Sequence, residues 1–435
     1  MAVTGRFVVL LALGLLPVVL LGATPDGALL VLAAWILLCL AVALADLALA
    51  ASPRRIRLER EEPGRVRLGE RSESRLYLTN TGSRALRGLV RDAWDPTAGA
   101  PRMREPVSIP PGERRAVRTP LRPVRRGTRR ARHVTVRSFG PLRLFARQAT
   151  LQTSGTLLVL PPFRARRHLP SRLARLREMD GQTQLMIRGQ GTEFDSLREY
   201  VRGDDVRSID WRATARRQEL VVRNWRPERD RRVLIVLDAG RVSAARIGDE
   251  TRLDASIESS LLLAALADRA GDRVDLLSWE RRVRARVQGV SGAALLPRMV
   301  EAMADVEPEL IETDWQALPG LVRGVTSRRS LVVVLTTLES AGTAEEFLDV
   351  LPQLTRSHLV VVAGVTDPGT ALVAQNRSSR EAVYRAAAAE RAMLDRERVR
   401  AAMNRLGAEV VSAPPEELPP ALADRYLALK AAGRL

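Results

Sequence analysis

The sequence predicts a multi-domain protein with a two-span transmembrane α-hairpin, a small all-β domain and a doubly wound α/β domain. Two long apolar runs near the N-terminus predict the hairpin. Between residues 54 and 160, short stretches that alternate apolar and polar residues predict strands. From residue 231 onward, strand-like and helix-like stretches follow one another, as in a mostly parallel sheet. We therefore expect domains at 1–52, 53–162 and 231–435, with a linker and charged segment at 163–230.

The two apolar runs are residues 7–22 and 28–45, and each is close to the ~20 residues that cross a bilayer. A cleaved signal peptide is the alternative for the first run, but a secreted protein would not need the second. Arginines flank the pair at Arg6 and Arg54, whereas the turn between the runs carries only Asp26. The positive-inside rule therefore predicts a two-pass protein of the cell membrane, with both termini and the soluble domains in the cytoplasm.

Residues 54–160 contain alternating stretches such as RIRLERE and SRLYLTN, separated by turn sequences such as NTG and PPG. Short strands at nearly regular spacing are typical of an antiparallel sandwich of immunoglobulin-like size. The stretch shows no catalytic constellation, so we expect it to hold the next domain at a set distance from the membrane. The arginine-rich stretch at 123–133 is compatible with contact to anionic lipid, but also with a charged sheet edge.

The composition bears on the class of function. A formal net charge of +19 raises the alternative of an arginine-driven nucleic-acid binder. The arginines are spread along the chain and often stand beside acids, so we expect no nucleic-acid partner. Cys39 is the single cysteine and lies in an apolar run, which excludes an intrachain disulfide and a cysteine-based metal site. The three histidines are far apart and lack ligand spacing.

The C-terminal region is expected to form an open parallel sheet with helices on both faces. The predicted strands are 233–238, 274–280, 282–288, 330–337, 358–365 and 408–413, and the predicted helices are 252–270, 293–304, 315–325, 344–354, 378–406 and 419–431. In such sheets, ligands bind beyond the carboxyl ends of the strands, where this chain has Asp238, Thr336, Thr337, Thr366 and Asp367. The sequence has no dinucleotide-binding GxGxxG after the first strand, no phosphate loop and no GxSxG elbow.

The segment 189–238 interleaves acids and arginines with aromatic residues. Ser196 and Glu199 match a capping box, which predicts a short helix ending at Gly203. Asp210 is the expected cap of a second helix at 211–217. Residues 219–225 are expected as an edge strand beside 233–238.

We expect the paired charges of this segment to dock it on the α/β domain, with Tyr200, Trp211 and Trp225 as apolar anchors. A cell-envelope enzyme that uses the acids of the segment is the alternative. No nucleophile or metal set accompanies those acids, so a non-catalytic role is expected. The candidate interaction residues are Glu193, Arg198, Glu199, Tyr200, Asp204, Asp205, Arg207, Asp210, Trp211 and Arg216.

The pattern GxGTEFxxLREYxxGDDxRxIDWxAxAR at 189–216 resembles the signature of a bacterial family called domain of unknown function fifty-eight. The resemblance extends over essentially the whole chain and implies an α/β domain similar to a von Willebrand factor A module. Members of the family often accompany MoxR-type AAA+ ATPases in assembling or maturing other proteins. The resemblance therefore implies a membrane-anchored, non-catalytic interaction or assembly factor that works with such an ATPase on an unidentified client.

The resemblance also implies where a metal would bind. The A-type module commonly holds Mg²⁺ through Asp-x-Ser-x-Ser after the first strand, a loop threonine and a later aspartate, which is an oxygen set suited to a hard cation. Here both serine positions are replaced and a threonine stands where the later aspartate is expected, so no metal or other cofactor is expected. Arg241 is hypothesised to supply the missing positive charge beside Asp238, or to be a solvated loop residue. The degenerate metal-site positions are Asp238, Gly240, Arg241, Val242, Thr313 and Thr337.

Overall fold

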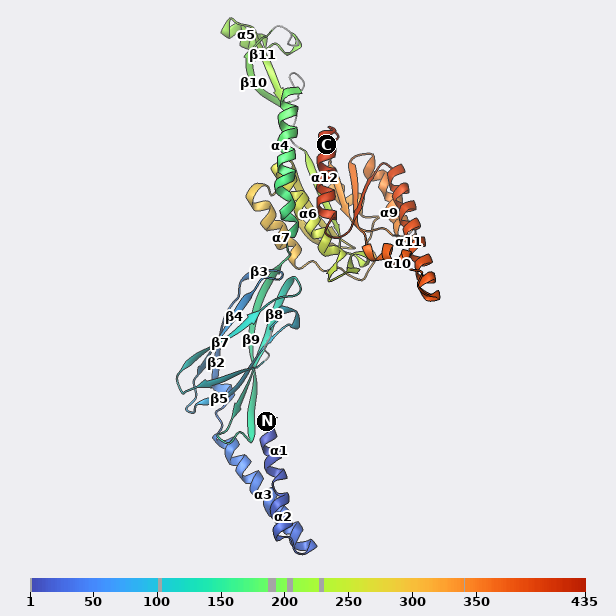
Figure 1. Ribbon diagram of the computed structural model, residues 1–435. Coiled ribbons are helices and arrows are strands. Elements are labelled where there is room, and N and C mark those ends of the chain that lie inside the picture. Colours follow the sequence, from blue (N-terminus) through green and yellow to red (C-terminus); the bar gives the residue numbers. More distant parts are fainter. Residues whose placement is uncertain (1, 101–103, 187–192, 202–205, 227–230, 340) are drawn as a thin grey trace. The chain divides into compact units, whose positions relative to one another are not determined.

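The computed structural model describes residues 2–100, 104–186, 193–201, 206–226, 231–339 and 341–435 (Figure 1). The chain forms two compact units, Met1–Leu160 and Pro161–Leu435. The first unit contains the N-terminal helices and two β-sheets. The second contains a large, mostly parallel sheet with its helices, together with two small antiparallel pairs of strands.

The N-terminal helices are α1 (Gly5–Ala12), α2 (Leu15–Leu21) and α3 (Pro25–Leu49). In the described part of the chain, one helix, beginning at Pro25, is long and apolar enough to cross a membrane, with a mean hydropathy of 2.9. At ~1.5 Å per residue, α3 is roughly 37 Å long, which exceeds the ~30 Å hydrocarbon core of a bilayer. The expected first span is shorter and is divided between α1 and α2, where Gly14 makes room for the ring of Trp35.

The C-terminal end of α3 is fixed to the β-sheets of the same unit. The carboxylate of Asp46 accepts hydrogen bonds from the backbone N–H groups of Leu142 at 2.7 Å and Leu144 at 2.9 Å. Gly140 permits this approach, because a Cβ there would lie 2.2 Å from Asp46 oxygens. Arg147 also donates to a carbonyl in the last turn of α3, at 3.0 Å, where a helix leaves carbonyls without intrahelical partners.

Residues 56–160 form a sandwich of two sheets, as the alternating stretches predict. One sheet has the order β1-β9-β8-β5-β6 with β3 beside β9, and the other has the order β2-β4-β7. Leu76 and Leu78 from one sheet pack with Val134 and Val136 from the other in a buried core. The strands are β1 (Ala2–Val3), β2 (Ile56–Glu61), β3 (Arg65–Arg67), β4 (Ser72–Asn80), β5 (Leu86–Trp94), β6 (Glu105–Ile109), β7 (Arg114–Leu121), β8 (Gly127–Phe139) and β9 (Phe145–Leu160).

The large sheet of the second unit has the strand order β16-β15-β12-β17-β18-β19. All neighbouring pairs are parallel except β15 with β16, which form a hairpin. The chain therefore leaves the central strand β12 first toward one edge and then, from β17 onward, toward the other. The strands are β12 (Arg232–Asp238), β15 (Arg273–Trp279), β16 (Val283–Val287), β17 (Leu331–Leu335), β18 (Leu359–Val365) and β19 (Glu409–Ala413).

Helices cover both faces of this sheet (Figure 1). Alternate strand residues such as Leu234, Val332 and Val360 pack against α8, α9 and α11, while α6 and α12 pack together on the opposite face. Both faces of the sheet are thus shielded from water by helices, which explains why its strands are apolar at consecutive positions. The helices are α6 (Arg252–Arg269), α7 (Leu295–Ala304), α8 (Leu318–Val325), α9 (Ala341–Thr355), α10 (Pro368–Gln375), α11 (Arg380–Arg405) and α12 (Leu418–Ala431).

Several local predictions differ from the structure. The stretch with the capping-box pattern is not a helix but strand β10 (Glu193–Glu199), which pairs antiparallel with β11 (Val221–Arg226). Accordingly, β11 does not extend the large sheet beside β12. Pairing of two strands with alternating side chains here outweighs a local capping signal worth about 1 kcal/mol. Helix α4 (Leu169–Met186), within the segment at 163–230, and α10, in the C-terminal region, were not expected.

Candidate functional site

The carboxyl end of β12 carries a buried carboxylate surrounded by hydroxyl groups. Asp238 is only 1% exposed and accepts hydrogen bonds from Thr313 Oγ1 at 2.5 Å, Thr336 Oγ1 at 2.6 Å and the backbone N–H of Gly240 at 2.8 Å. Asp238 is the last residue of β12, and Thr336 directly follows the adjacent strand β17, where the order of the sheet reverses. This position is the one at which open α/β sheets bind ligands.

The space around this carboxylate is filled by the chain itself. A Cβ built on Gly240 would lie 2.2 Å from Thr313 Oγ1, so no side chain fits at this position unless Thr313 moves. Thr337, which we had placed in the degenerate metal site, points elsewhere and accepts from the backbone N–H of Val365 at 3.1 Å. Its neighbour Thr336 is the residue that contacts Asp238, because successive side chains of an extended segment point to opposite faces.

These residues do not fit a bound Mg²⁺. Both hydroxyl groups and the Gly240 N–H donate to the carboxylate, and positions 240 and 242 carry no ligand oxygen in their side chains. Burial raises the pKa of the Asp238 carboxyl, although the hydrogen bonds from Thr313 and Thr336 act in the opposite direction. Across the described residues, no group of three or more His, Cys, Asp or Glu side chains is placed to hold a metal ion.

Arg241 does not supply a charge to Asp238 through a direct pair. Its guanidinium forms an ion pair with Glu312, and both side chains are more than half exposed. The backbone N–H of Arg241 donates to the carbonyl of Ile311 at 2.8 Å. The loop that supplies Thr313 is thereby held beside the end of β12, and it presents Leu310 to solvent with 77% exposure.

The charged segment forms a small module of β10, β11 and α5 (Trp211–Arg217). Asp210 caps α5 as predicted, accepting from the backbone N–H groups of Arg212 and Ala213 at 3.0 Å. The same carboxylate pairs with Arg223 on β11 at 2.8 Å. The hydrogen bond from Ala213 and the ion pair with Arg223 lower the pKa of Asp210 below its ordinary value. One acid thus fixes the helix to the hairpin.

Trp211 does not serve as an inward anchor, because its side chain is 65% exposed. Helix α5 carries three arginines and no acid, and all three arginines are exposed, including Arg216. Arg207 is also exposed, Tyr200 is half-buried, and Arg198 donates to the carbonyl of Glu199 at 3.2 Å. Asp204, Asp205 and the side chains of Glu193 and Trp225 lie outside the described residues.

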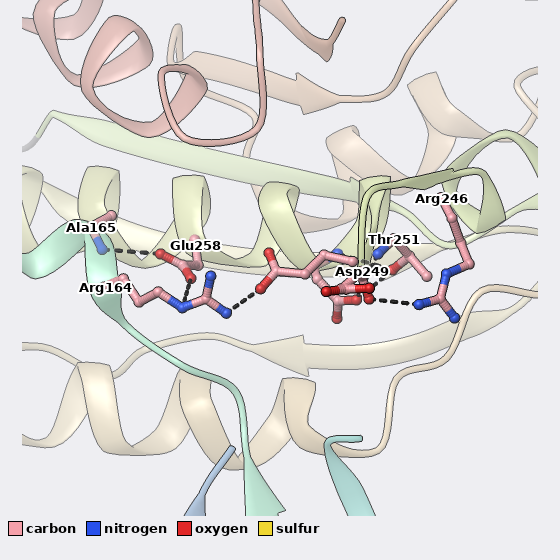
Figure 2. Close-up of polar contacts among 8 residues, drawn as sticks. Arg164, Ala165, Arg246, Asp249, Thr251 and Glu258 are labelled. Atoms are coloured by element: carbon pink, nitrogen blue, oxygen red, sulfur yellow. Dashed lines mark hydrogen bonds and ion pairs between the residues drawn. The ribbon is translucent and has the colours of Figure 1, made fainter. Parts of the chain in front are cut away.

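The segment before α4 is attached to α6, as Figure 2 shows. The Glu258 carboxylate accepts from the backbone N–H of Ala165 at 3.0 Å and lies 3.8 Å from the Arg164 guanidinium. Arg164 also pairs with Glu250, just before α6. Burial raises the pKa of Glu258, and these two contacts oppose that effect. The residues were not expected from sequence, since a lone glutamate within an apolar helix gives no signal of its partner.

Comparison with known proteins gives one family match. The model of a family described as protein of unknown function DUF58 matches residues 196–410. No curated protein matches the chain. A solved CARDB domain from Pyrococcus furiosus, in complex with di-metal ions, is 16% identical with a TM-score of 0.18, over 24% of this chain and 93% of that chain. Proximal thread matrix protein 1 from the mussel byssus, with a zinc-occupied MIDAS motif, is 14% identical with a TM-score of 0.28, over 46% of each chain.

Proposed function

The chain belongs to the DUF58 family of proteins of unknown function, and from this premise we propose that it is a membrane-anchored, non-catalytic interaction or assembly factor that recruits an acidic protein partner. The partner would be a MoxR-type AAA+ ATPase or the client on which that ATPase acts. The apolar helix α3 supports the membrane anchor. The second unit, with its parallel sheet and the α5 module, would make the protein contacts.

The observation that carries this proposal is the exposed Trp211 on a helix whose only charged residues are arginines. Tryptophan and arginine are the residue types that most often dominate the free energy of protein association. The backbone of the helix is held in place by the Asp210 cap and by the ion pair to Arg223, so the segment that carries the indole and the guanidinium groups need not be ordered on binding. An acidic surface of a partner would complement the arginines and speed association.

The von Willebrand factor A-like domain that the family resemblance implies is part of the same proposal. The acid at the end of the first strand of the parallel sheet and the loop threonine beside it fit that part. In the absence of a fitting metal set, the loop that carries Leu310 offers an apolar contact next to this position instead. Recognition there would depend on shape and apolar contact rather than on a metal-bound carboxylate.

Two spans with a cytoplasmic body complete the proposal. The arginines on both sides of the helical hairpin and the uncharged apolar run at residues 7–22 support this topology. A reporter fused at the C-terminus that is active only in the cytoplasm is the expected result. A reporter active only outside the cytoplasm would contradict it and would favour a cell-envelope role.

Crosslinking followed by affinity capture from membranes tests the docking surface. We expect the wild-type chain to capture a partner that is lost or weakened about tenfold or more in Trp211→Ala and in Arg216→Ala. Tyr384→Ala and Arg385→Ala are matched controls, because these residues are similarly exposed on α11. If the controls lose the partner equally, or no partner depends on Trp211, the docking surface is wrong. Salt-sensitive retention of nucleic acid that depends on Arg216 would instead favour the nucleic-acid alternative.

A further inference from the structure

A cavity of about 240 Å³ lies at the carboxyl ends of β17, β18 and β19, against α11. It is separate from the α5 surface and borders the Asp238 position only through Thr336. At ~30 Å³ for each molecule of liquid water, its volume corresponds to roughly eight waters, which suits a small organic molecule. Gly364 lines it, and a Cβ at this position would lie 2.9 Å from the carbonyl oxygen of Thr336.

The charged groups around the cavity sum to an excess of one positive charge. Arg396 lies in the wall and pairs with Glu339 at 3.3 Å, but Glu339 is shared with the buried Arg252. Arg400, also in the wall, pairs with Glu397 at 3.6 Å. Among the residues that line the cavity, two arginines, Arg396 and Arg400, therefore stand against one glutamate, Glu397. The Nε of Arg396 is buried without a hydrogen-bond partner among the described residues, so its guanidinium uses only part of its donor capacity.

The remaining wall has two kinds of surface. Leu338, Val365, Met393 and Met403 contribute apolar atoms, and the flexible methionines can adapt to the outline of a ligand. The hydroxyl groups of Thr366 and Ser412 can hydrogen-bond to either a donor or an acceptor, whereas those of Thr336 and Thr337 are engaged with Asp238 and Val365. A pocket with a mainly apolar side and a few convergent polar groups is the usual form of a small-molecule site.

We propose that this cavity binds a small organic monoanion, a carboxylate on a short apolar chain, with its head at Arg396 and Arg400. One negative charge balances the excess of one positive charge. The planar guanidinium groups match a carboxylate, and the apolar chain lies against the methionines. The proposal is independent of the docking surface at Trp211, because the two sites share no residue.

Calorimetric titration of the full chain in lipid nanodiscs tests the proposal, with empty nanodiscs as the blank. The probe is hexanoate, with hexanamide as its uncharged counterpart of the same length. We expect saturable binding of hexanoate with a dissociation constant of about 1 mM or tighter, and binding of hexanamide that is about tenfold weaker or not detectable. Equal binding of the two compounds, or no binding of hexanoate, would overturn the proposal.

Variants locate the site. Arg400→Gln is the primary variant, because its side chain is half exposed and its removal is not expected to impair folding. We expect it to weaken hexanoate binding about tenfold, and Arg396→Lys to do the same by replacing the planar group. Arg391→Gln is the matched control on the same helix, since Arg391 pairs with Asp395 and does not line the cavity. Hexanoate affinity that is unchanged in Arg400→Gln and Arg396→Lys, or reduced equally in Arg391→Gln, would place the ligand elsewhere and refute the proposal.

Discussion

Substitution of Gly240 by alanine is the most direct test of the closed arrangement at Asp238. The added methyl group would lie 2.2 Å from Thr313 Oγ1 and 3.0 Å from the carbonyl oxygen of Ile311. The first distance is far below van der Waals contact, so either the backbone shifts or Thr313 turns away. If Thr313 turns away, Asp238 loses the hydrogen bond that now measures 2.5 Å.

Both routes lead to a similar loss of stability. Overpacking in a filled interior costs about 1–3 kcal/mol, and removing one hydrogen bond from a buried charged group costs about the same. For a domain of roughly 150–250 residues, each kcal/mol corresponds to about 2–4 °C in Tm. We therefore expect Gly240→Ala to lower the unfolding temperature of the second unit by roughly 2–12 °C.

Differential scanning calorimetry of the full chain measures this shift. Gly324→Ala is the control, because a Cβ at Gly324 in α8 meets no atom within 4 Å. Alanine within a helix is favoured over glycine by about 0.5–1 kcal/mol, so this control should be neutral or slightly stabilising. A Gly240→Ala protein as stable as wild type would show that the space beside Thr313 is open, and the argument against a bound ligand at Asp238 would fail.

Three further predictions concern charge. Burial raises the folded-state pKa of Asp238 above the unfolded value of about 3.9. The neutral carboxyl therefore makes its full contribution to the free energy of unfolding below about pH 3.9, and this contribution is lost as the pH rises through the folded-state pKa. Asp238→Asn should therefore gain in Tm relative to wild type between pH 4 and pH 8, and a constant difference would contradict this sign. Titration with Mg²⁺ or Mn²⁺ should show no saturable heat. Tight binding that Asp238→Ala abolishes would overturn the conclusion that the residues around Asp238 do not fit a metal ion. Lys430 pairs with the buried Asp272 at 2.9 Å, so Lys430→Met should cost about 3–5 kcal/mol in thermal unfolding and Lys430→Arg markedly less, whereas equal losses would implicate packing alone.

The sequence predicts the large sheet well because long apolar strands allow few alternatives. The strands around Asp238 and the loop threonine Thr313 were anticipated, since the ends of parallel strands meet at one edge. The sequence comparison selected Thr337, whereas Thr336 contacts Asp238, because a shift of one residue reverses which face a side chain occupies and a motif comparison does not fix that parity.

Where local and tertiary effects compete, sequence alone is a weaker guide. Ser196 and Glu199 have the spacing of a helix cap. Both residues lie in β10, however, and the pairing of β10 with β11 supplies more hydrogen bonds than a cap does. Helix α4 lacks a clear apolar stripe and was missed. The partner of Arg241 is another example: Asp238 and Glu312 are both acids, and only the folded loop decides between them.

The hydrogen bonds from Leu142 and Leu144 to Asp46 have a mechanical consequence. A membrane helix joined to its soluble domain by a flexible linker can spin about its own axis without turning the domain. Here only six residues separate the end of α3 from β2, and the Asp46 carboxylate accepts hydrogen bonds from the turn between β8 and β9. Under the proposed membrane anchor, tilt or rotation of α3 in response to lipid thickness would therefore be transmitted directly to the sandwich.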